Sequence, residues 1–136
     1  MTNNSALLII DMQADFVKIE LSSVFIPSGK SIIQPILQAK KKFIERKLTV
    51  INIITIHGRD KSELGVKDIE LSRDYCIADT AGAAIIDELL PSAGEITVSK
   101  KFYSGFFNTD LRKILETKKI SNLFFTGLTT GCCVSS

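Results

Sequence analysis

The chain has 136 residues, 45% of them hydrophobic and 24% charged, and its 17 Lys and Arg residues against 15 Asp and Glu give a net charge of +2. This composition is typical of a globular protein and excludes an intrinsically disordered one, so we expect a single domain over residues 1–136. The small net charge, with no nucleic-acid-binding motif and no apolar run of membrane-spanning length, argues against nucleic-acid and membrane partners.

The first predicted strand is the apolar segment Ala6–Ile10, which is short and continuous, as is typical of a strand buried on both faces. A helix is predicted next, because Ser31 and Gln34 have the spacing of a capping box and Pro35 is tolerated in a first turn. An apolar stripe at helical spacing continues this helix, and it consists of Ile32, Ile36, Ala39 and Phe43. We expect the lysines at positions 40–42 on its solvated face.

A second strand is predicted over Leu48–Ile56, the segment richest in β-branched residues. The polar stretch Gly58–Asp79 predicts a loop. A short helix is predicted over Gly82–Leu90, stopping before Pro91. The segment Glu95–Ser99 then predicts a third strand.

The last part of the chain predicts one more helix and one more strand. The helix is expected to begin at Asn108 or Thr109, with Lys118 and Lys119 near the negative end of its dipole. Its inward-facing residues are predicted to be Leu111, Ile114 and Leu115. The fourth strand is predicted over Asn122–Gly127.

Strands that alternate with helices predict an α/β fold with a parallel sheet and helices on both faces, which makes three layers. Ligands of such sheets bind beyond the carboxyl ends of the strands. This rule selects the polar residues that follow the predicted strands, which are Asp11, His57, Lys100, Cys132 and Cys133. We therefore expect a carboxylate, a cation and a thiol along one edge of the sheet.

These groups could form a nucleophilic unit for acyl transfer. A carboxylate can take the proton of a thiol, a lysine can hold both charges, and the turn before Cys133 can offer backbone N–H groups to an oxyanion. Other interpretations remain open from the residues alone. Asp11 could cap a turn, Lys100 could be a surface lysine, and Cys133 could be a small buried residue.

The three cysteines also bear on metals and on location. They are Cys76, Cys132 and Cys133, an odd number with one adjacent pair, which is a poor basis for a disulfide framework. We predict free thiols in the reducing cytoplasm, and residues 1–11 show no signal peptide. The cysteines and His57 have suitable ligand types for zinc, but no CxxC pattern is present and we expect no metal. A redox switch at Cys132–Cys133 is a further alternative.

Three stretches in order resemble the signature blocks of the isochorismatase-like cysteine hydrolases. They read "ALLIIDMQADF" (6–16), "KKFYSGFFNTDL" (100–111) and "FFTGLTTGCCV" (124–134). The blocks of that superfamily are D-M-Q-x-D-F after an apolar strand, K-x-x-Y-S-x-F before a helix, and G-x-x-T-x-x-C-V. The similarity extends over essentially the whole chain and implies the isochorismatase-like fold.

The resemblance implies a role for each matching residue. Asp11 would be the general base, Lys100 the paired cation and Cys133 the nucleophile, with a non-proline cis peptide at Leu128–Thr129. The backbone N–H groups of Thr129 and Cys133 would form the oxyanion hole. The substrate pocket would be lined by Phe16, Tyr103 and Phe106.

The implied reaction is hydrolysis of a non-peptide C–N bond in a small amide, ureido or carbamoyl compound through a Cys133 acyl-enzyme, without a cofactor. True isochorismatases do not use the cysteine, and the D-x-H metal pattern of nicotinamidases is not matched by "IHGRD" (56–60). The segment "DTAGAA" (79–84) departs from G-T-x-G-A-E, a stretch that touches substrate in relatives.

The resemblance also predicts a homo-oligomer, as relatives often form dimers or tetramers. Relatives continue after C-V with a helix and two strands, so we expect the domain to be incomplete at its C-terminus, with those strands missing. The alternative function is therefore a truncated, catalytically inactive member that acts as an oligomerisation or binding subunit.

Overall fold

The computed structural model describes residues 4–22, 24–56, 76, 80–100 and 109–128, and for Lys100, Thr109 and Asp110 it describes the backbone. Four strands are present in this part of the chain, namely β1 (Ser5–Ile10), β2 (Thr49–Thr55), β3 (Ile96–Lys100) and β4 (Asn122–Gly127). The helices are α1 (Ala14–Val17), α2 (Ile33–Glu45) and α4 (Thr109–Thr117). All four predicted strands are confirmed, and β4 has the predicted bounds.

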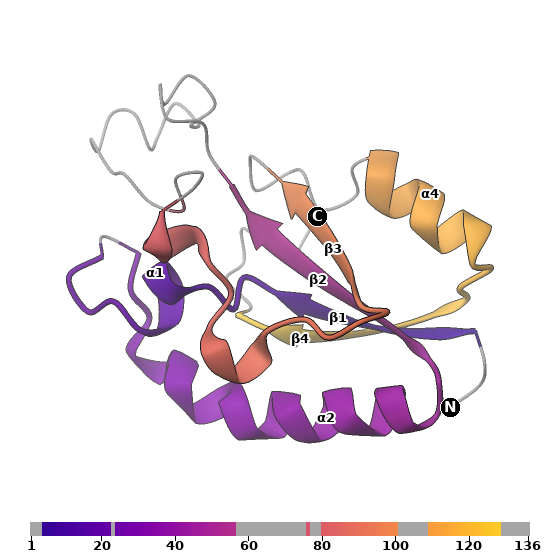
Figure 1. The fold of residues 1–136 in the computed structure, drawn as a ribbon, viewed down its shortest axis with the longest axis horizontal. Coiled ribbons are helices and arrows are strands. Elements are labelled where there is room, and N and C mark those ends of the chain that lie inside the picture. The colour runs from indigo at the N-terminus through magenta and orange to yellow at the C-terminus, as the bar shows by residue number, and fades with distance from the viewer. Residues whose placement is uncertain (1–3, 23, 57–75, 77–79, 101–108, 129–136) are drawn as a thin grey trace.

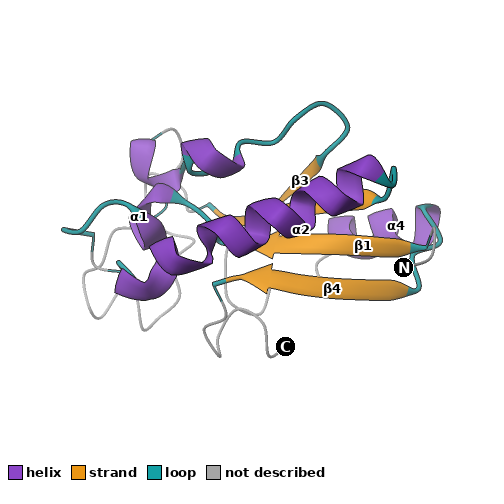
Figure 2. Cartoon of the chain, turned by 90° about the horizontal axis from the view of Figure 1, so that it is seen from below, coloured by secondary structure: helices purple, strands orange, loops and turns teal. Residues whose placement is uncertain are grey.

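The strands form one sheet in the order β3-β2-β1-β4, and every neighbouring pair is parallel. Helix α2 covers one face of the sheet and α4 packs on the other, as Figures 1 and 2 show from two directions. The three-layer α/β architecture predicted from the sequence is therefore confirmed. In the described ranges no helix is both long enough and apolar enough to cross a bilayer.

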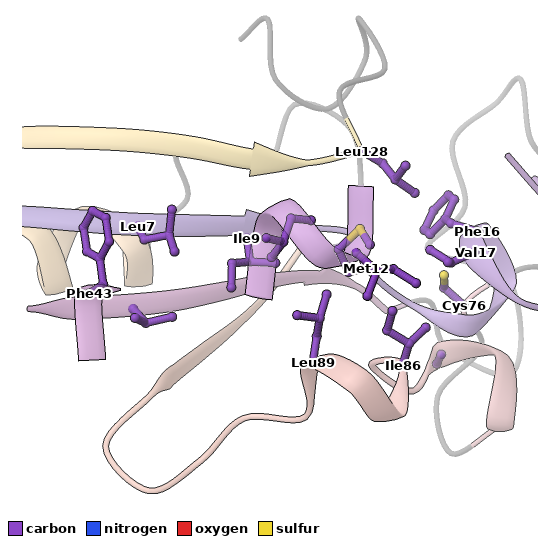
Figure 3. Close-up of a cluster of buried hydrophobic side chains, with 14 residues drawn as sticks. Leu7, Ile9, Met12, Phe16, Val17, Phe43, Cys76, Ile86, Leu89 and Leu128 are labelled. Carbon is purple, nitrogen blue, oxygen red and sulfur yellow. The ribbon is translucent and has the colours of Figure 1, made fainter. Parts of the chain in front are cut away.

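Two hydrophobic clusters separate the layers, because successive side chains of a strand point to opposite faces. Leu7 and Ile9 of β1 belong to the cluster on the α2 side, which Figure 3 shows in close-up. Leu8 and Ile10 belong to the cluster beneath α4 together with Leu111. All six residues of β1 are buried, so the continuous apolar run reflects burial on both faces.

The start of α2 differs from the prediction. A 3-10 turn spans Pro27–Ile32, and α2 begins at Ile33 without a side-chain cap. The hydroxyl of Ser31 donates a hydrogen bond of 2.7 Å to the carbonyl of Ser28, so this residue closes the preceding turn. The predicted capping box is therefore wrong, since the hydroxyl bonds backwards along the chain.

The predicted helix over Gly82–Leu90 is also wrong. Two 3-10 turns occupy Ala81–Ala83 and Asp87–Leu89, and the backbone between them pairs with Gln13 through an antiparallel bridge at Ile85. The Ile86 N–H donates to the Met12 carbonyl at 3.0 Å, and the Ala14 N–H donates to the Ala84 carbonyl at 2.9 Å. Pairing with the segment after β1 satisfies these backbone groups in place of helical bonds. The predicted loop 58–79 lies outside the described residues except for Cys76.

Lys40 is buried, with 7% of its surface exposed, which contradicts the prediction of a solvated face. Its Nζ lies 3.0 Å from Oε2 of Glu95 and 3.1 Å from the carbonyl of Leu90. Glu95 also accepts hydrogen bonds from the side chain of Asn52 and from the N–H and hydroxyl of Ser92. We call Lys40, Asn52, Ser92 and Glu95 the Lys40 cluster. Because charged side chains are rarely buried unless paired, the ion pair accounts for this burial.

Candidate active site

Asp11 immediately follows β1 and adopts an unusual backbone conformation. Its φ is 55°, in the left-handed region that Asp tolerates better than most residues. Its N–H donates to the carbonyl of Ile53 at 2.8 Å, and 1% of its surface is exposed. The carboxylate is therefore held at the carboxyl end of the central strand in a buried position.

The carboxylate of Asp11 is bound by the strand next to it. The hydroxyl of Thr55, the last residue of β2, donates to Oδ1 of Asp11 at 2.9 Å. Thr55 is itself paired in register with Lys100, the last residue of β3. The sheet therefore brings the backbone of Lys100 to the strand that contacts Asp11.

Gln13 fixes the end of β2 with its side chain. Its Nε2 donates to the carbonyl of Thr55 at 2.7 Å, and its Oε1 accepts from the N–H of Thr55 at 2.9 Å. Nε2 also donates to the carbonyl of Ala83 at 2.9 Å. Gln13 is completely buried. We call Asp11, Gln13 and Thr55 the Asp11 cluster.

Asp15, on the short helix α1, connects this region to two later segments. Its Oδ2 accepts a hydrogen bond of 2.7 Å from the N–H of Cys76. A Cβ at Gly82 would lie 2.2 Å from the same oxygen. A larger residue at position 82 would therefore displace the Asp15 carboxylate, and this close contact places the segment around Gly82 against α1.

The end of β4 lies directly beside the end of β1. Gly127 pairs with Ile10, and its φ of +106° is a conformation that glycine adopts without strain. The N–H of Leu128 donates to the carbonyl of Ile10 at 3.0 Å. The segment that leads towards residues 129–136 therefore leaves the sheet next to Asp11.

The structure describes only some of the residues expected at the site. Asp11 is at the predicted strand end, and Lys100 ends β3, where its backbone is described. Phe16, which is 8% exposed, belongs to the same hydrophobic cluster as Leu128, and Figure 3 shows both side chains. The other predicted residues lie outside the described ranges, namely His57, Tyr103, Phe106, Thr129, Cys132 and Cys133, and the peptide bond 128–129 involves one of them.

The sequence does not predict that Thr55 bonds to Asp11 or that Gln13 holds Thr55. Gln13 and Asp15 lie within the first signature block, but no role was predicted for either. The predicted strand Leu48–Ile56 contains Thr55 and puts His57 at its carboxyl end. The structure ends β2 at Thr55. The rule that polar groups gather at carboxyl strand ends would have found Thr55 if the end had been set correctly.

Potential metal ligands do not gather in the described part of the chain, where no three His, Cys, Asp or Glu side chains form a group that could hold an ion. Cys76 is fully buried there, and its sulfur is not part of a disulfide. What the described residues do provide is a fixed, buried carboxylate beside two strand ends. A carboxylate in such a position can act as a general base.

Curated relatives match the chain over different lengths. Over 53 residues, 39% of this chain, the sequence is 55% identical to the ureidoacrylate amidohydrolase RutB of Yersinia enterocolitica, and the match spans 23% of that protein. An Arabidopsis thaliana protein named "Probable inactive nicotinamidase" is 30% identical over 141 residues, which cover 96% of this chain and 69% of the relative. The chain thus matches about a quarter of the first relative and about two thirds of the second.

Solved structures and a family comparison agree with the fold. The N-carbamoylsarcosine amidase of Thermoplasma acidophilum has a TM-score of 0.82 to this chain at 26% identity, over 97% of this chain and 72% of that one. Residues 5–136 match the isochorismatase domain, as the three sequence blocks predict. Because that match covers nearly the whole chain, the protein belongs to the isochorismatase domain family.

Proposed function

We propose that the protein is a cysteine hydrolase that cleaves a non-peptide C–N bond in a small amide, ureido or carbamoyl compound. The observation that carries the proposal is Asp11, a buried carboxylate at the end of the central strand whose oxygen accepts a hydrogen bond from Thr55. Relatives named as a ureidoacrylate amidohydrolase and an N-carbamoylsarcosine amidase support the class of substrate.

In the proposed mechanism Asp11 takes the proton of the Cys133 thiol, and the thiolate attacks the carbonyl carbon of the substrate. Asp11 then returns the proton to the leaving nitrogen as the C–N bond breaks. Water hydrolyses the resulting thioester and regenerates the thiol. Lys100 would balance the charges of the carboxylate and the thiolate, and the N–H groups of Thr129 and Cys133 would stabilise the oxyanion.

The positions of two strand ends support these roles. Thr55 contacts Asp11 and pairs in register with Lys100. The N–H of Leu128 donates to the carbonyl of Ile10, the residue before Asp11. Cys133 follows five positions after Leu128 in the sequence. The thiol would therefore approach the carboxylate from the side of the neighbouring strand β4, and the cation from β3, which lies one strand beyond β2.

A second candidate is a binding subunit without catalytic activity. The Arabidopsis relative that covers 96% of this chain is named as inactive, which favours testing this possibility directly. The two candidates differ in the thiol. A hydrolase needs an activated Cys133, whereas a binding subunit does not.

The test is release of ammonia from ureidoacrylate, N-carbamoylsarcosine and nicotinamide, the compounds suggested by the names of the relatives. We expect turnover of at least one of them, and loss of turnover by a factor of about 10² to 10⁴ in Cys133→Ala and Asp11→Asn. Cys132→Ala and Asp87→Asn make the same chemical changes at a neighbouring thiol and at an exposed carboxylate, and should retain activity. Unchanged turnover in Cys133→Ala would refute the mechanism.

Alkylation gives a second measurement that needs no substrate. Iodoacetamide at pH 7, followed by mass spectrometry, should modify Cys133 about tenfold faster than Cys132 or the buried Cys76, because an activated thiol is the faster nucleophile. Equal slow alkylation of all three, together with no ammonia release, would favour the binding subunit.

A further inference from the structure

We infer that Thr55 is a positioning residue of this site, whose hydroxyl sets the orientation of the Asp11 carboxylate while Gln13 holds Thr55 in place. The inference rests on the proposed function, since it assigns Thr55 a part in the same reaction. Neither residue was expected at the site from the sequence.

The contact between Thr55 and Asp11 is short and shielded from water. Oγ1 of Thr55 lies 2.9 Å from Oδ1 of Asp11, and the two residues are 6% and 1% exposed. A hydrogen bond to an ionised carboxylate is roughly twice as strong as one between neutral groups, and burial strengthens it further. Rotation of the carboxylate about its Cβ–Cγ bond would break this hydrogen bond. The hydroxyl therefore selects one orientation of the two oxygens.

The position of the Thr55 hydroxyl is in turn fixed from two sides. The Gln13 side chain bonds both the N–H and the carbonyl of Thr55, so it pairs with this residue much as a neighbouring strand would. Its third hydrogen bond, to Ala83, prevents the amide from turning over. The branched side chain of threonine is stiff about χ1, so a fixed backbone leaves the hydroxyl few directions.

A purely structural interpretation of these contacts predicts a different outcome from the positioning interpretation. If the hydroxyl only satisfies a buried oxygen, its loss should lower stability and leave the rate of the folded protein unchanged. If it orients the base, its loss should lower kcat in folded protein and leave KM close to its original value. The second expectation follows because Thr55 contacts the base rather than the substrate, and small misplacements of a reacting group cost up to about 10²-fold in rate.

The experiment compares Thr55→Val, Thr55→Ser and Thr49→Val with the unmodified chain. Valine keeps the shape of threonine without the hydroxyl, and serine keeps the hydroxyl. Thr49 lies at the other end of β2, where it pairs with Ala6, and serves as the matched control. The readouts are kcat and KM for the best substrate of the ammonia assay, the rate of Cys133 alkylation, and urea unfolding to confirm that each variant is folded.

We expect Thr55→Val to lower kcat and the alkylation rate by about tenfold or more with KM within about twofold, Thr55→Ser to restore most of the rate, and Thr49→Val to change neither. A folded Thr55→Val variant with unchanged kcat overturns the inference while leaving the proposed function intact. An equal loss in the valine and serine variants overturns it as well, since the hydroxyl is then not what matters. If the unmodified chain turns over none of the substrates, or if Cys133→Ala keeps full turnover, the proposed function is refuted, and this inference is refuted with it.

Discussion

Two polar clusters, each around a buried carboxylate, lie in different parts of the same sheet, and they are built in opposite ways. The Lys40 cluster lies towards the amino ends of the strands, where Glu95 directly precedes β3. It joins a cation and a carboxylate from elements far apart in the sequence. The Asp11 cluster lies at the carboxyl ends, and two of its three members are neighbours in one signature block.

We infer from the difference that the Lys40 cluster serves stability, whereas the proposed function assigns the Asp11 cluster to chemistry. Glu95 forms an ion pair with Lys40 and accepts three hydrogen bonds from Asn52 and Ser92, so its charge is balanced within the cluster. In the Asp11 cluster the side chain of Gln13 bonds to the backbone of Thr55, and the carboxylate belongs to a residue that is itself in the left-handed conformation. Balanced charge in a remote cluster is typical of a structural ion pair, and local backbone strain around a buried acid is typical of a functional site.

The largest effect on stability is expected when the Lys40 cluster is broken. Lys40→Met keeps the length of the side chain and leaves Glu95 buried without its cation, which costs about 3–5 kcal/mol in the free energy of unfolding. Lys18→Met is the matched control, because Lys18 forms an ion pair with Glu88 in which both side chains are more than a third exposed. This control should cost less than about 1 kcal/mol.

Urea unfolding of both variants measures this contrast. We expect the folded Lys40→Met variant to keep the turnover of the unmodified chain while Thr55→Val loses it, which would support a structural role for the Lys40 cluster and a catalytic one for the Asp11 cluster. Similar losses of stability in the two lysine variants would show that burial of the Lys40 pair has no special weight.

A smaller effect is expected where β4 approaches β1. A Cβ at Gly127 would lie 2.3 Å from the carbonyl oxygen and 2.6 Å from the nitrogen of Ile10. Both are backbone atoms, which cannot move away by a side-chain rotation. Gly94 has a similar φ of +93°, but nothing lies within 4 Å of its added Cβ. Gly94→Ala should therefore cost about 1 kcal/mol for conformation alone. Gly127→Ala should cost about 2 kcal/mol more because of overpacking.

The readouts for the two glycine variants are the urea midpoint and ammonia release. We expect the alanine at position 127 to lower turnover as well, since it pushes the end of β4 away from Ile10. Equal destabilisation of the two variants would mean that the close approach contributes nothing beyond the left-handed backbone.

The smallest expected effect is the loss of stability at acidic pH that results from protonation of Glu95. Burial by itself would raise the pKa of Glu95, but the hydrogen bonds from Ser92, Asn52 and Lys40 outweigh it and lower this pKa below the ordinary value of 4.5. Because the pKa is lower in the folded state, the ionised carboxylate adds stability above about pH 4.5 and this contribution is lost as the pH falls through the lowered value.

Unfolding free energies between pH 6 and pH 3 test this expectation. The curve of Glu95→Gln should fall less steeply below pH 4.5 than that of the unmodified chain. Glu88→Gln is the exposed control, since the hydrogen bond from Lys18 also lowers the pKa of Glu88. High salt should reduce the acid-dependent part contributed by Glu88 and leave that of Glu95, because buried pairs are screened less. Parallel curves for Glu95→Gln and the unmodified chain would contradict the assignment.

Much of the fold could be predicted because its signals are local. β1 is a continuous apolar run ended by Asp11, and β4 was placed correctly because Asn122 and Gly127 mark its ends. The inward residues of α4 follow helical spacing, and Leu111 is completely buried as expected. The place of Asp11 is predictable for the same reason, since a polar residue at the end of a buried parallel strand is visible in the sequence, and its catalytic role stays a prediction.

The remaining features depend on contacts between distant segments. Lys40 is buried only because Glu95 reaches it, and nothing near position 40 indicates that partner. The segment around Ile85 lacks helix because it pairs with Gln13. Thr55 meets Asp11 through the register that aligns Ile10 with Ile53. The order of the four strands has no local signal either, since parallel strands are joined by crossovers of similar composition.

The pairing of β1 with β4 has a consequence for how the molecule is made. Ser5 pairs with Asn122 and Ile10 with Gly127. β1 is therefore translated long before β4, the strand that pairs with this edge of it. Contacts between such distant segments carry a large loop-closure cost and form slowly. On the ribosome, β1 can pair with β2 early and must keep its other edge open until β4 emerges. An open strand edge in a nascent chain is prone to mispairing, so this edge of β1 is exposed to aggregation until β4 has been translated.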